Sequence, residues 1–221
     1  MRDENLERLS KVQTSYNDPY YLHLSYIFDA LRDASKYVQG RMIDLGCGNK
    51  PYREIFPKVT NYVGCDVAQS SEGVVDIICD VTEIPLEDES FDTVFSSQVI
   101  EHVSKPQDLC NEAYRLLRKG GYFVLAGPMY WHLHEEPYDF YRFTKYGFKH
   151  LLEEAGFEVV KISSNGGKWA MVGLVAIHGM IGTRFGKPFV IRSINRIFGW
   201  ADRKRYDDMN TSNYVLIARK C

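Results

Sequence analysis

Three aspartates in the first half of the chain each follow a short apolar run: Asp44, Asp66 and Asp80. Gly46 and Gly48 come directly after the first of them, in the segment IDLGCGNKPY. Aspartate often ends a strand and caps the following turn, so one such residue would say little. Three of them at predicted strand ends, one beside a Gly-x-Gly, predict a polar edge that binds a ligand.

Pro51 stands where a dinucleotide-binding loop has its third glycine. A pyrophosphate requires backbone N–H groups at a helix N-terminus, not carboxylates. Pro51 fits the first turn of a helix instead. These residues favour a ligand with a positive charge, a ribose and a base but no phosphate, and S-adenosylmethionine (SAM) has these features. An acid about 20 residues past the glycines can bind ribose hydroxyls, and Asp66 is so placed.

Apolar runs alternate with helical patterns along the middle of the chain, which predicts a doubly wound, mostly parallel α/β sheet. The helices are expected within 106–117 and 144–155, the second with Thr144 as its N-cap. Ligands bind where the parallel strands end. The seven predicted strands are 41–46, 61–67, 74–81, 91–97, 120–128, 157–164 and 214–219.

The chain is expected to form a single domain of 221 residues. Its formal net charge of −2 gives no overall attraction for nucleic acid. The five cysteines form no C-x-x-C pair and the first residues lack an apolar signal core, so a cytoplasmic location is expected. The predicted parts are an N-terminal helical cap (1–40), a core (41–164), a helical insertion (165–212) and a final strand (213–221).

The segments IDLGCG, VGCDV and ICDVTEIPLEDESFDTVFSSQVIEHV, with AYRLLRKGGYFVLAGP after them, resemble the class I SAM-dependent methyltransferases. Within that family, the chain is most similar to bacterial small-molecule and glycan-type methyltransferase domains. The resemblance covers roughly residues 41–164. It implies a Rossmann-like sheet of seven strands, the last one antiparallel, and SAM as the cofactor. Lys50 departs from the family pattern, in which a small residue is usual.

The resemblance also implies a role for each strand end. Asp44 would orient the methionine ammonium of SAM, while Gly46 and Gly48 let the backbone approach it. Asp66, with Val67 beside it, would hold the ribose diol. Adenine would bind at Asp80 and the backbone of Val81. Ser97 and Gln98 would lie under the cofactor, near the transferred methyl group.

The segment GPMYWHLHEEPYDFYRFT, 127–144, follows the fifth predicted strand and is rich in polar and aromatic residues. In one interpretation it lines the acceptor, with His134 or His132 as general base and Glu135 or Asp139 orienting it. Tyr141 and Arg142 would then contact the acceptor. In the other, Asp139 and Arg142 pair to hold a loop.

No metal is expected at this segment, because its imidazoles and carboxylates are bunched together and no distant partner is evident. His102 is expected to be structural or near the cofactor. Tyr16, Tyr20, Tyr21 and His23 could close over the cofactor as a lid or could pack in the core.

The expected activity is methyl transfer from SAM to a small-molecule or glycan-type acceptor, at oxygen. A non-catalytic SAM-binding domain and a nucleic-acid methyltransferase are the alternatives, and a NAD-dependent oxidoreductase is remote without the third glycine. The strand-end segment SSQV has no Asn/Asp-Pro-Pro-Tyr motif, so no nucleic-acid partner is expected. Residues 184–205 combine basic and apolar side chains, which suits weak membrane-surface contact, a cap over the site or a homodimer contact.

Overall fold

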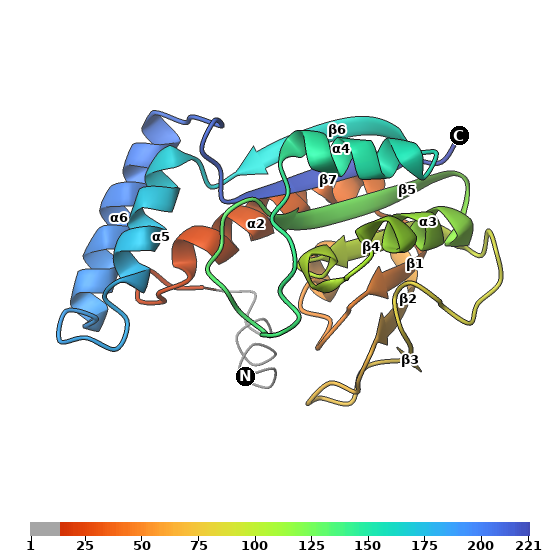
Figure 1. Ribbon diagram of the computed structural model, residues 1–221, viewed down its shortest axis with the longest axis horizontal. Coiled ribbons are helices and arrows are strands. Elements are labelled where there is room, and N and C mark those ends of the chain that lie inside the picture. The colour runs from red at the N-terminus through yellow and green to blue at the C-terminus, as the bar shows by residue number, and fades with distance from the viewer. Residues whose placement is uncertain (1–13) are drawn as a thin grey trace.

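The computed structural model describes residues 14–221, so the first thirteen residues of the predicted cap lie outside it. A seven-stranded sheet of order β3-β2-β1-β4-β5-β7-β6 forms its centre (Figure 1). The pairs are parallel except those of β7, which runs antiparallel to β5 and β6. The predicted fold class is therefore confirmed. The strands are β1 (Gly40–Leu45), β2 (Val59–Asp66), β3 (Ile77–Ile78), β4 (Phe91–Ser97), β5 (Leu117–Pro128), β6 (Glu158–Asn165) and β7 (Asn213–Arg219).

Five α-helices lie in the described residues, joined by three short 3₁₀ helices. Thr144 is the N-cap of α4 as predicted, because its side chain accepts the N–H of Gly147 at 3.1 Å. The α-helices are α2 (Tyr21–Ala34), α3 (Pro106–Leu116), α4 (Lys145–Glu154), α5 (Lys168–His178) and α6 (Pro188–Lys204). The 3₁₀ helices are η1 (Ser35–Tyr37), η2 (Arg53–Ile55) and η3 (Ile100–His102).

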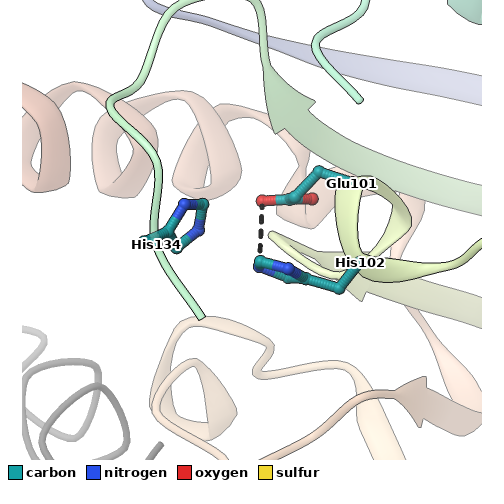
Figure 2. Close-up of side chains that lie close together, drawn as sticks. All are labelled: Glu101, His102 and His134. Atoms are coloured by element: carbon teal, nitrogen blue, oxygen red, sulfur yellow. Dashed lines mark ion pairs between the residues drawn. The ribbon is translucent and has the colours of Figure 1, made fainter. Parts of the chain in front are cut away.

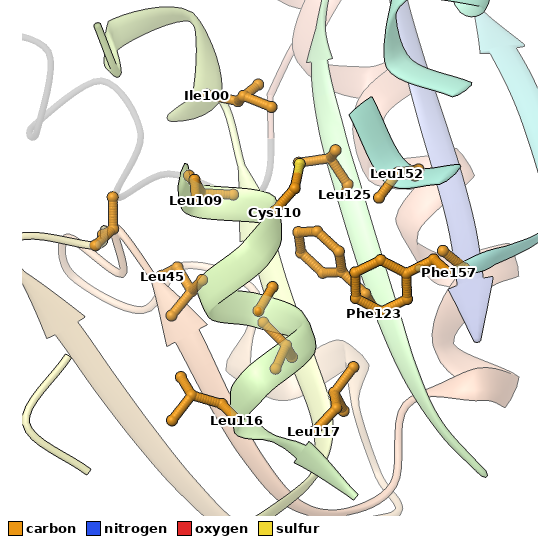
Figure 3. Packing of buried hydrophobic residues seen from close by; sticks show 14 of the residues in the cluster. Leu45, Ile100, Leu109, Cys110, Leu116, Leu117, Phe123, Leu125, Leu152 and Phe157 are labelled. Atoms are coloured by element: carbon orange, nitrogen blue, oxygen red, sulfur yellow. The ribbon is translucent and has the colours of Figure 1, made fainter. Parts of the chain in front are cut away.

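Side chains of the central strands alternate between two cores, because successive residues of a strand point to opposite faces. In β5, Phe123 and Leu125 pack in the core that includes α3 and α4 residues, whereas Val124 and Ala126 pack in the core on the other face. Figure 3 shows the first core, in which α3 supplies Leu109, Cys110 and Leu116. This rigid sandwich fixes the positions of the strand ends.

Helix α2 covers the second face of the sheet, where Ile27 and Leu31 are fully buried. The helix of the predicted N-terminal cap is therefore one of the layers of the sandwich. Between β6 and β7, helices α5 and α6 lie side by side at one end of the sheet (Figure 1). The buried carboxylate of Asp202 in α6 accepts the N–H groups of Gly167, Trp169 and Ala170, which joins α6 to the start of α5.

The predicted third strand, 74–81, is wrong in length, since β3 contains only Ile77 and Ile78. The carboxylate of Asp76 accepts the N–H of Gly64 in β2 at 2.7 Å. The N–H of Val75 donates to the side-chain oxygen of Gln69 at 2.9 Å. Side-chain acceptors thus satisfy backbone groups around the strand, and the regular ladder is confined to two residues.

Two smaller predictions are also wrong. Pro51 does not begin an α-helix: it lies in a turn before η2, because β2 already begins at Val59 and leaves room for a single 3₁₀ turn. Leu117 was expected in the helix before β5. It begins β5 instead, because it pairs with Phe91 of β4.

Candidate active site

The loop after β1 depends on glycines with left-handed backbone conformations. Gly46 has φ +77° and Gly48 has φ +47°. A Cβ atom on Gly46 would lie 2.3 Å from Cγ2 of Val99, so no larger residue fits there without movement. The N–H groups of Gly46 and Cys47 donate to the carbonyl oxygen of Cys65, at 2.9 and 3.0 Å. The ends of β1 and β2 are thereby tied together.

Asp44, near the C-terminal end of β1, is a buried carboxylate. The hydroxyl of Tyr62 donates to Oδ2 of Asp44 at 2.5 Å. Burial raises the pKa of Asp44 to about 7, even though the Tyr62 hydrogen bond acts in the opposite direction. An incoming cation would favour the ionised form, so the side chain is suited to an ammonium ligand. Sequence reasoning missed Tyr62, which carries no local motif.

Lys50 turns away from this loop's ligand side. Its buried ammonium donates to Oδ2 of Asp76 at 2.5 Å. The chain passes over Gly64, where an added Cβ would lie 2.5 Å from Cε of Lys50. Lys50 therefore links the loop to β2 and the β2–β3 connection, and its departure from the family pattern places no charge among the cavity-lining residues.

The carboxylate of Asp66, at the end of β2, is held by backbone donors. The N–H of Gly48 donates to its Oδ2 at 3.1 Å, and the N–H of Val67 donates to its Oδ1 at 2.8 Å. Asp80 begins the turn after β3, and its Oδ1 accepts both the N–H and the hydroxyl of Thr82, at 2.9 and 2.7 Å. Both aspartates are thus fixed in place at the ligand edge.

A cavity of about 870 Å³ opens at these strand ends. This volume is within the range of a nucleoside-sized ligand site, about 300–1,000 Å³. Its lining includes every residue predicted to bind the cofactor. These are Asp44, Gly46, Gly48, Asp66, Val67, Asp80, Val81, Ser97 and Gln98.

Other lining residues were not predicted. Tyr52 and Phe95 contact each other at the cavity, with ring centroids 5.6 Å apart. Val99 and Val103 follow β4, and Asn49 lies in the glycine loop. Each is an ordinary core or loop residue in the sequence, so only the folded sheet reveals its place.

The segment after β5 crosses beside this cavity and is organised around Asp139. Arg142 binds the Asp139 carboxylate with both terminal nitrogens, at 2.6 and 2.8 Å. The backbone N–H of His134 donates to Asp139 at 3.1 Å, and Nδ1 of His134 lies 3.3 Å from the same Oδ2. Burial opposes ionisation of Asp139, but these hydrogen bonds outweigh it and lower the pKa of the carboxyl to about 2.

Glu135 and Asp139 were the two residues predicted to orient the histidine. Of these, Asp139 contacts the imidazole of His134. The other, Glu135, lines the large cavity and also a smaller one that His134 borders. Burial lowers the pKa of His134, and the neighbouring His102 lowers it further. A neutral imidazole with a carboxylate behind its Nδ1 can accept a proton at Nε2.

Arg142 is used within the loop. Besides Asp139, its guanidinium donates to the carbonyl oxygens of Trp131, His132 and Tyr141. The hydroxyl of Tyr141 donates to the carbonyl oxygen of Ser104 at 3.0 Å. These contacts favour the loop-holding interpretation for both Arg142 and Tyr141. The exposed ring of His132 lies 4.5 Å from that of His178, outside both mapped cavities.

A second cavity, with a volume of only about 20 Å³, adjoins the first. Gln98, His102 and Glu135 line both cavities, and His134 lines the smaller one. Tyr20 and His23 also line it, and His23 stacks on Trp131 with ring centroids 4.0 Å apart. Of the four candidate lid residues, these two border the site. Tyr16 and Tyr21 pack against each other instead, at 4.4 Å.

Glu101 and His102 of η3 lie opposite His134. The rings of His102 and His134 are 4.6 Å apart, and Nε2 of His102 is 4.0 Å from Oε1 of Glu101 (Figure 2). Burial raises the pKa of Glu101 to about 8. His102 was expected to be structural or near the cofactor, whereas nothing in the sequence indicated that Glu101 would lie at this point.

Comparison with known proteins shows similarity to methyltransferases. Residues 43–125 match the family model described as a methyltransferase domain. A SAM-dependent methyltransferase from Archaeoglobus fulgidus has a similar structure, with a TM-score of 0.58 and 22% identity over 87% of this chain and 92% of that one. The chain has the class I SAM-dependent methyltransferase fold, and its residues 43–125 are similar to the methyltransferase-domain family.

Curated relatives are similar over shorter stretches. One is the malonyl-[acyl-carrier protein] O-methyltransferase of a Marinomonas species, 42% identical over 50 residues. Another is the chloroplastic 2-methyl-6-phytyl-1,4-hydroquinone methyltransferase 2 of rice, 29% identical over 125 residues. These matches cover 23% and 51% of this chain but only 18% and 33% of the relatives. The relatives' names describe different acceptors.

Proposed function

We propose that this protein transfers the methyl group of SAM to a hydroxyl of a small-molecule or glycan-type acceptor. The observation that carries the proposal is the His134–Asp139 pair. His134 borders a small cavity that shares lining residues with the proposed cofactor cavity. Methyl transfer from a sulfonium is an in-line displacement with a neutral leaving group, so positioning supplies much of the rate. A base is needed because a hydroxyl must lose its proton.

The proposed steps use the chain's own groups. Asp44, the glycine loop and Asp66 hold the cofactor, while Ser97 and Gln98 lie beneath its reactive end. The acceptor hydroxyl gives its proton to Nε2 of His134 as its oxygen attacks the methyl carbon. The sulfur–carbon bond breaks, and S-adenosylhomocysteine leaves. Asp139 stabilises the imidazolium that forms, because its Oδ2 lies 3.3 Å from Nδ1 of His134.

Transfer of labelled methyl groups tests this proposal. A cell extract is divided into small-molecule, glycan, protein and nucleic-acid fractions. Each fraction is incubated in its own reaction with the purified protein and methyl-labelled SAM. Label is expected in the small-molecule or glycan fraction. His134→Ala should slow transfer by about 10²-fold or more, the usual contribution of a general base. His150→Ala, at an exposed site on α4, is the matched control and should keep full activity.

Label found only in nucleic acid would contradict the proposal in favour of a nucleic-acid methyltransferase. SAM binding without transfer to any fraction would favour a non-catalytic SAM-binding domain.

The described residues include no helix long and apolar enough to cross a bilayer. We propose a cytoplasmic location, supported by five cysteines that form no disulfide; export of the protein to an oxidising compartment would contradict it.

We also propose a weak contact between residues 184–205 and an anionic membrane surface. Three large apolar side chains of α6 are exposed, namely Phe189 (68%), Ile197 (61%) and Trp200 (63%). Exposed Arg192 and Arg196 lie along the same helix. Apolar side chains beside cationic ones suit the boundary between acyl chains and anionic headgroups. Such a surface would serve an acceptor that carries a lipid.

Sedimentation with liposomes tests the surface. Phosphatidylserine vesicles should carry the protein down at low salt, and phosphatidylcholine vesicles should not. A Phe189→Ser, Trp200→Ser double variant should lose the binding. No sedimentation at low salt would remove the membrane proposal. A concentration-dependent dimer abolished by the same variant would assign the face to a homodimer instead.

A further inference from the structure

Three metal-ligating side chains from two separate segments meet at the edge of the active site. Glu101 and His102 belong to η3, after β4, and His134 lies in the segment after β5. Figure 2 shows the three side chains facing one another. One ligand atom from each lies within 4.8 Å of those of the other two. The folded chain therefore brings ligands that are distant in sequence, Glu101 and His102, to His134, although none was evident from the sequence.

Both imidazoles have Nδ1 turned to an oxygen acceptor. Nδ1 of His102 lies 2.8 Å from the carbonyl oxygen of Tyr138. Nδ1 of His134 lies 3.2 Å from the carbonyl oxygen of His132 and 3.3 Å from Oδ2 of Asp139, with Nη2 of Arg142 farther away at 3.4 Å. Carbonyl and carboxylate oxygens only accept, so these contacts favour Nδ1–H and leave the Nε2 lone pairs available. Metal-binding histidines are oriented in this way by outer partners.

The carboxylate of Glu101 supplies the second, independent observation. Its side chain is 1% exposed, and neither carboxylate oxygen has a hydrogen-bond partner in another residue. Buried polar groups are rarely left without one, because desolvation then goes uncompensated. Arg142 is the largest charged influence on Glu101, but it is already paired with Asp139, and Glu135 adds a further carboxylate nearby. A bound cation would satisfy the carboxylate and balance this charge.

We propose that Glu101, His102 and His134 bind a divalent transition-metal ion of the Zn²⁺ type. Two imidazoles and one carboxylate form a ligand set of catalytic zinc sites, which keep a further position open. Ligand atoms of a tetrahedral ion at about 2 Å would lie roughly 3.3 Å apart. The present separations, up to 4.8 Å, would therefore shorten by as much as about 1.5 Å when the ion binds. Mg²⁺ and Ca²⁺ suit the set less well, because they prefer oxygen ligands.

The proposal that an ion binds here does not depend on the proposed function. The role given to the ion, however, rests on the proposed methyl transfer. With an ion bound, the Nε2 lone pair of His134 would be a ligand and could not accept the proton. The open position would instead bind the acceptor oxygen and lower the pKa of its hydroxyl, which would lose its proton to solvent. This narrows the acceptor to one whose hydroxyl or neighbouring oxygens can ligate a metal. It also predicts that a chelator lowers transfer without preventing SAM binding.

Metal titration of tag-free, chelator-treated full chain tests the proposal. Zn²⁺ is followed by calorimetry, and Co²⁺ by its visible absorption bands. One equivalent of each should bind, and the melting temperature should rise with the ion. Glu101→Gln, which preserves side-chain size, and His134→Ala should each weaken binding by about tenfold or more. His150→Ala should bind as the unchanged protein does.

SAM titration of the same samples distinguishes the two proposals. SAM binding by Glu101→Gln confirms that this variant is folded, since Glu101 is not among the residues that line the cofactor cavity. Unchanged protein that binds SAM but not Zn²⁺ or Co²⁺ would overturn the metal site alone. Metal binding that is equal in the unchanged protein and in both ligand variants would also overturn it. Loss of SAM binding by the unchanged protein would instead refute the proposed function.

Discussion

Asp44 and Asp66 hold negative charge at the strand ends in different ways. Asp66 accepts two backbone N–H groups, so its carboxylate is stabilised by the loop itself. Asp44 is buried with the Tyr62 hydroxyl, and its pKa is raised to about 7 by burial. The first is ready for neutral ribose hydroxyls, and the second for a cation that offsets the cost of ionising it. Their environments therefore match the two ends of SAM.

The raised pKa of Asp44 predicts pH-dependent SAM affinity. Below about pH 7 the free carboxyl is protonated and must ionise before it can pair with the ammonium of SAM, so affinity falls as pH falls. The dissociation constant should increase by about tenfold between pH 7.0 and pH 5.5. Calorimetry measures it directly. Asp44→Asn should bind weakly with little pH dependence, whereas an equally steep dependence in that variant would contradict this role.

The Lys50→Met variant tests whether Lys50 stabilises the fold or binds the cofactor. Loss of the partly buried Lys50–Asp76 pair should lower the free energy of unfolding by about 1–2 kcal/mol. At pH 8 the SAM dissociation constant of Lys50→Met should stay within roughly threefold of that of the unchanged protein, because the lysine is not among the cavity-lining residues. An indirect change of about half a kcal/mol in binding free energy is normal for a mutation elsewhere. Urea unfolding and calorimetry give both quantities. Lys58→Met, at an exposed site, is the control; a large loss of affinity in Lys50→Met would place the ammonium at the cofactor.

At the scale of elements, the sequence predicts best where burial and periodicity agree. β4 was predicted with its observed bounds, 91–97, and five of its seven residues are buried. The prediction fails where side chains replace backbone partners, as Asp76 and Gln69 do around β3. It also fails at Leu117, where pairing with Phe91 takes a residue of helical spacing into β5. These competing contacts depend on distant residues and leave no local pattern.

The N-cap of α4 offers a test at this scale. Thr144→Ala removes the acceptor for the N–H of Gly147 and should lower the free energy of unfolding by about 1 kcal/mol. Thr144→Ser keeps the hydroxyl and should retain most of the stability. Chemical denaturation compares the three proteins. Equal losses in the Ala and Ser variants would mean that the methyl group, not the cap, stabilises the helix.

At the scale of the whole molecule, the gathering of the predicted cofactor residues around one cavity was predictable from the sequence, whereas the arrangement of the segment after β5 was not. The predicted cofactor residues lie at the C-terminal ends of four strands or directly after them, and parallel strands bring those ends to one edge whatever the details of packing. The arrangement of the segment after β5 depends on how it crosses the segment after β4. That crossing brings Glu101 and His102 to His134 and turns Arg142 inward to Asp139. No spacing in the sequence encodes it.

Calorimetric titration with SAM and S-adenosylhomocysteine is the most direct test of the central claim, that the strand-end cavity is a SAM site. The unchanged protein should bind both compounds. Asp66→Ala should weaken binding by roughly 10²-fold through the loss of charge-assisted hydrogen bonds. Asp66→Asn should weaken it less, and Asp33→Ala, at an exposed site on α2, should leave it unchanged. Failure of the folded, unchanged protein to bind either compound, or affinity indifferent to Asp66, would contradict the account.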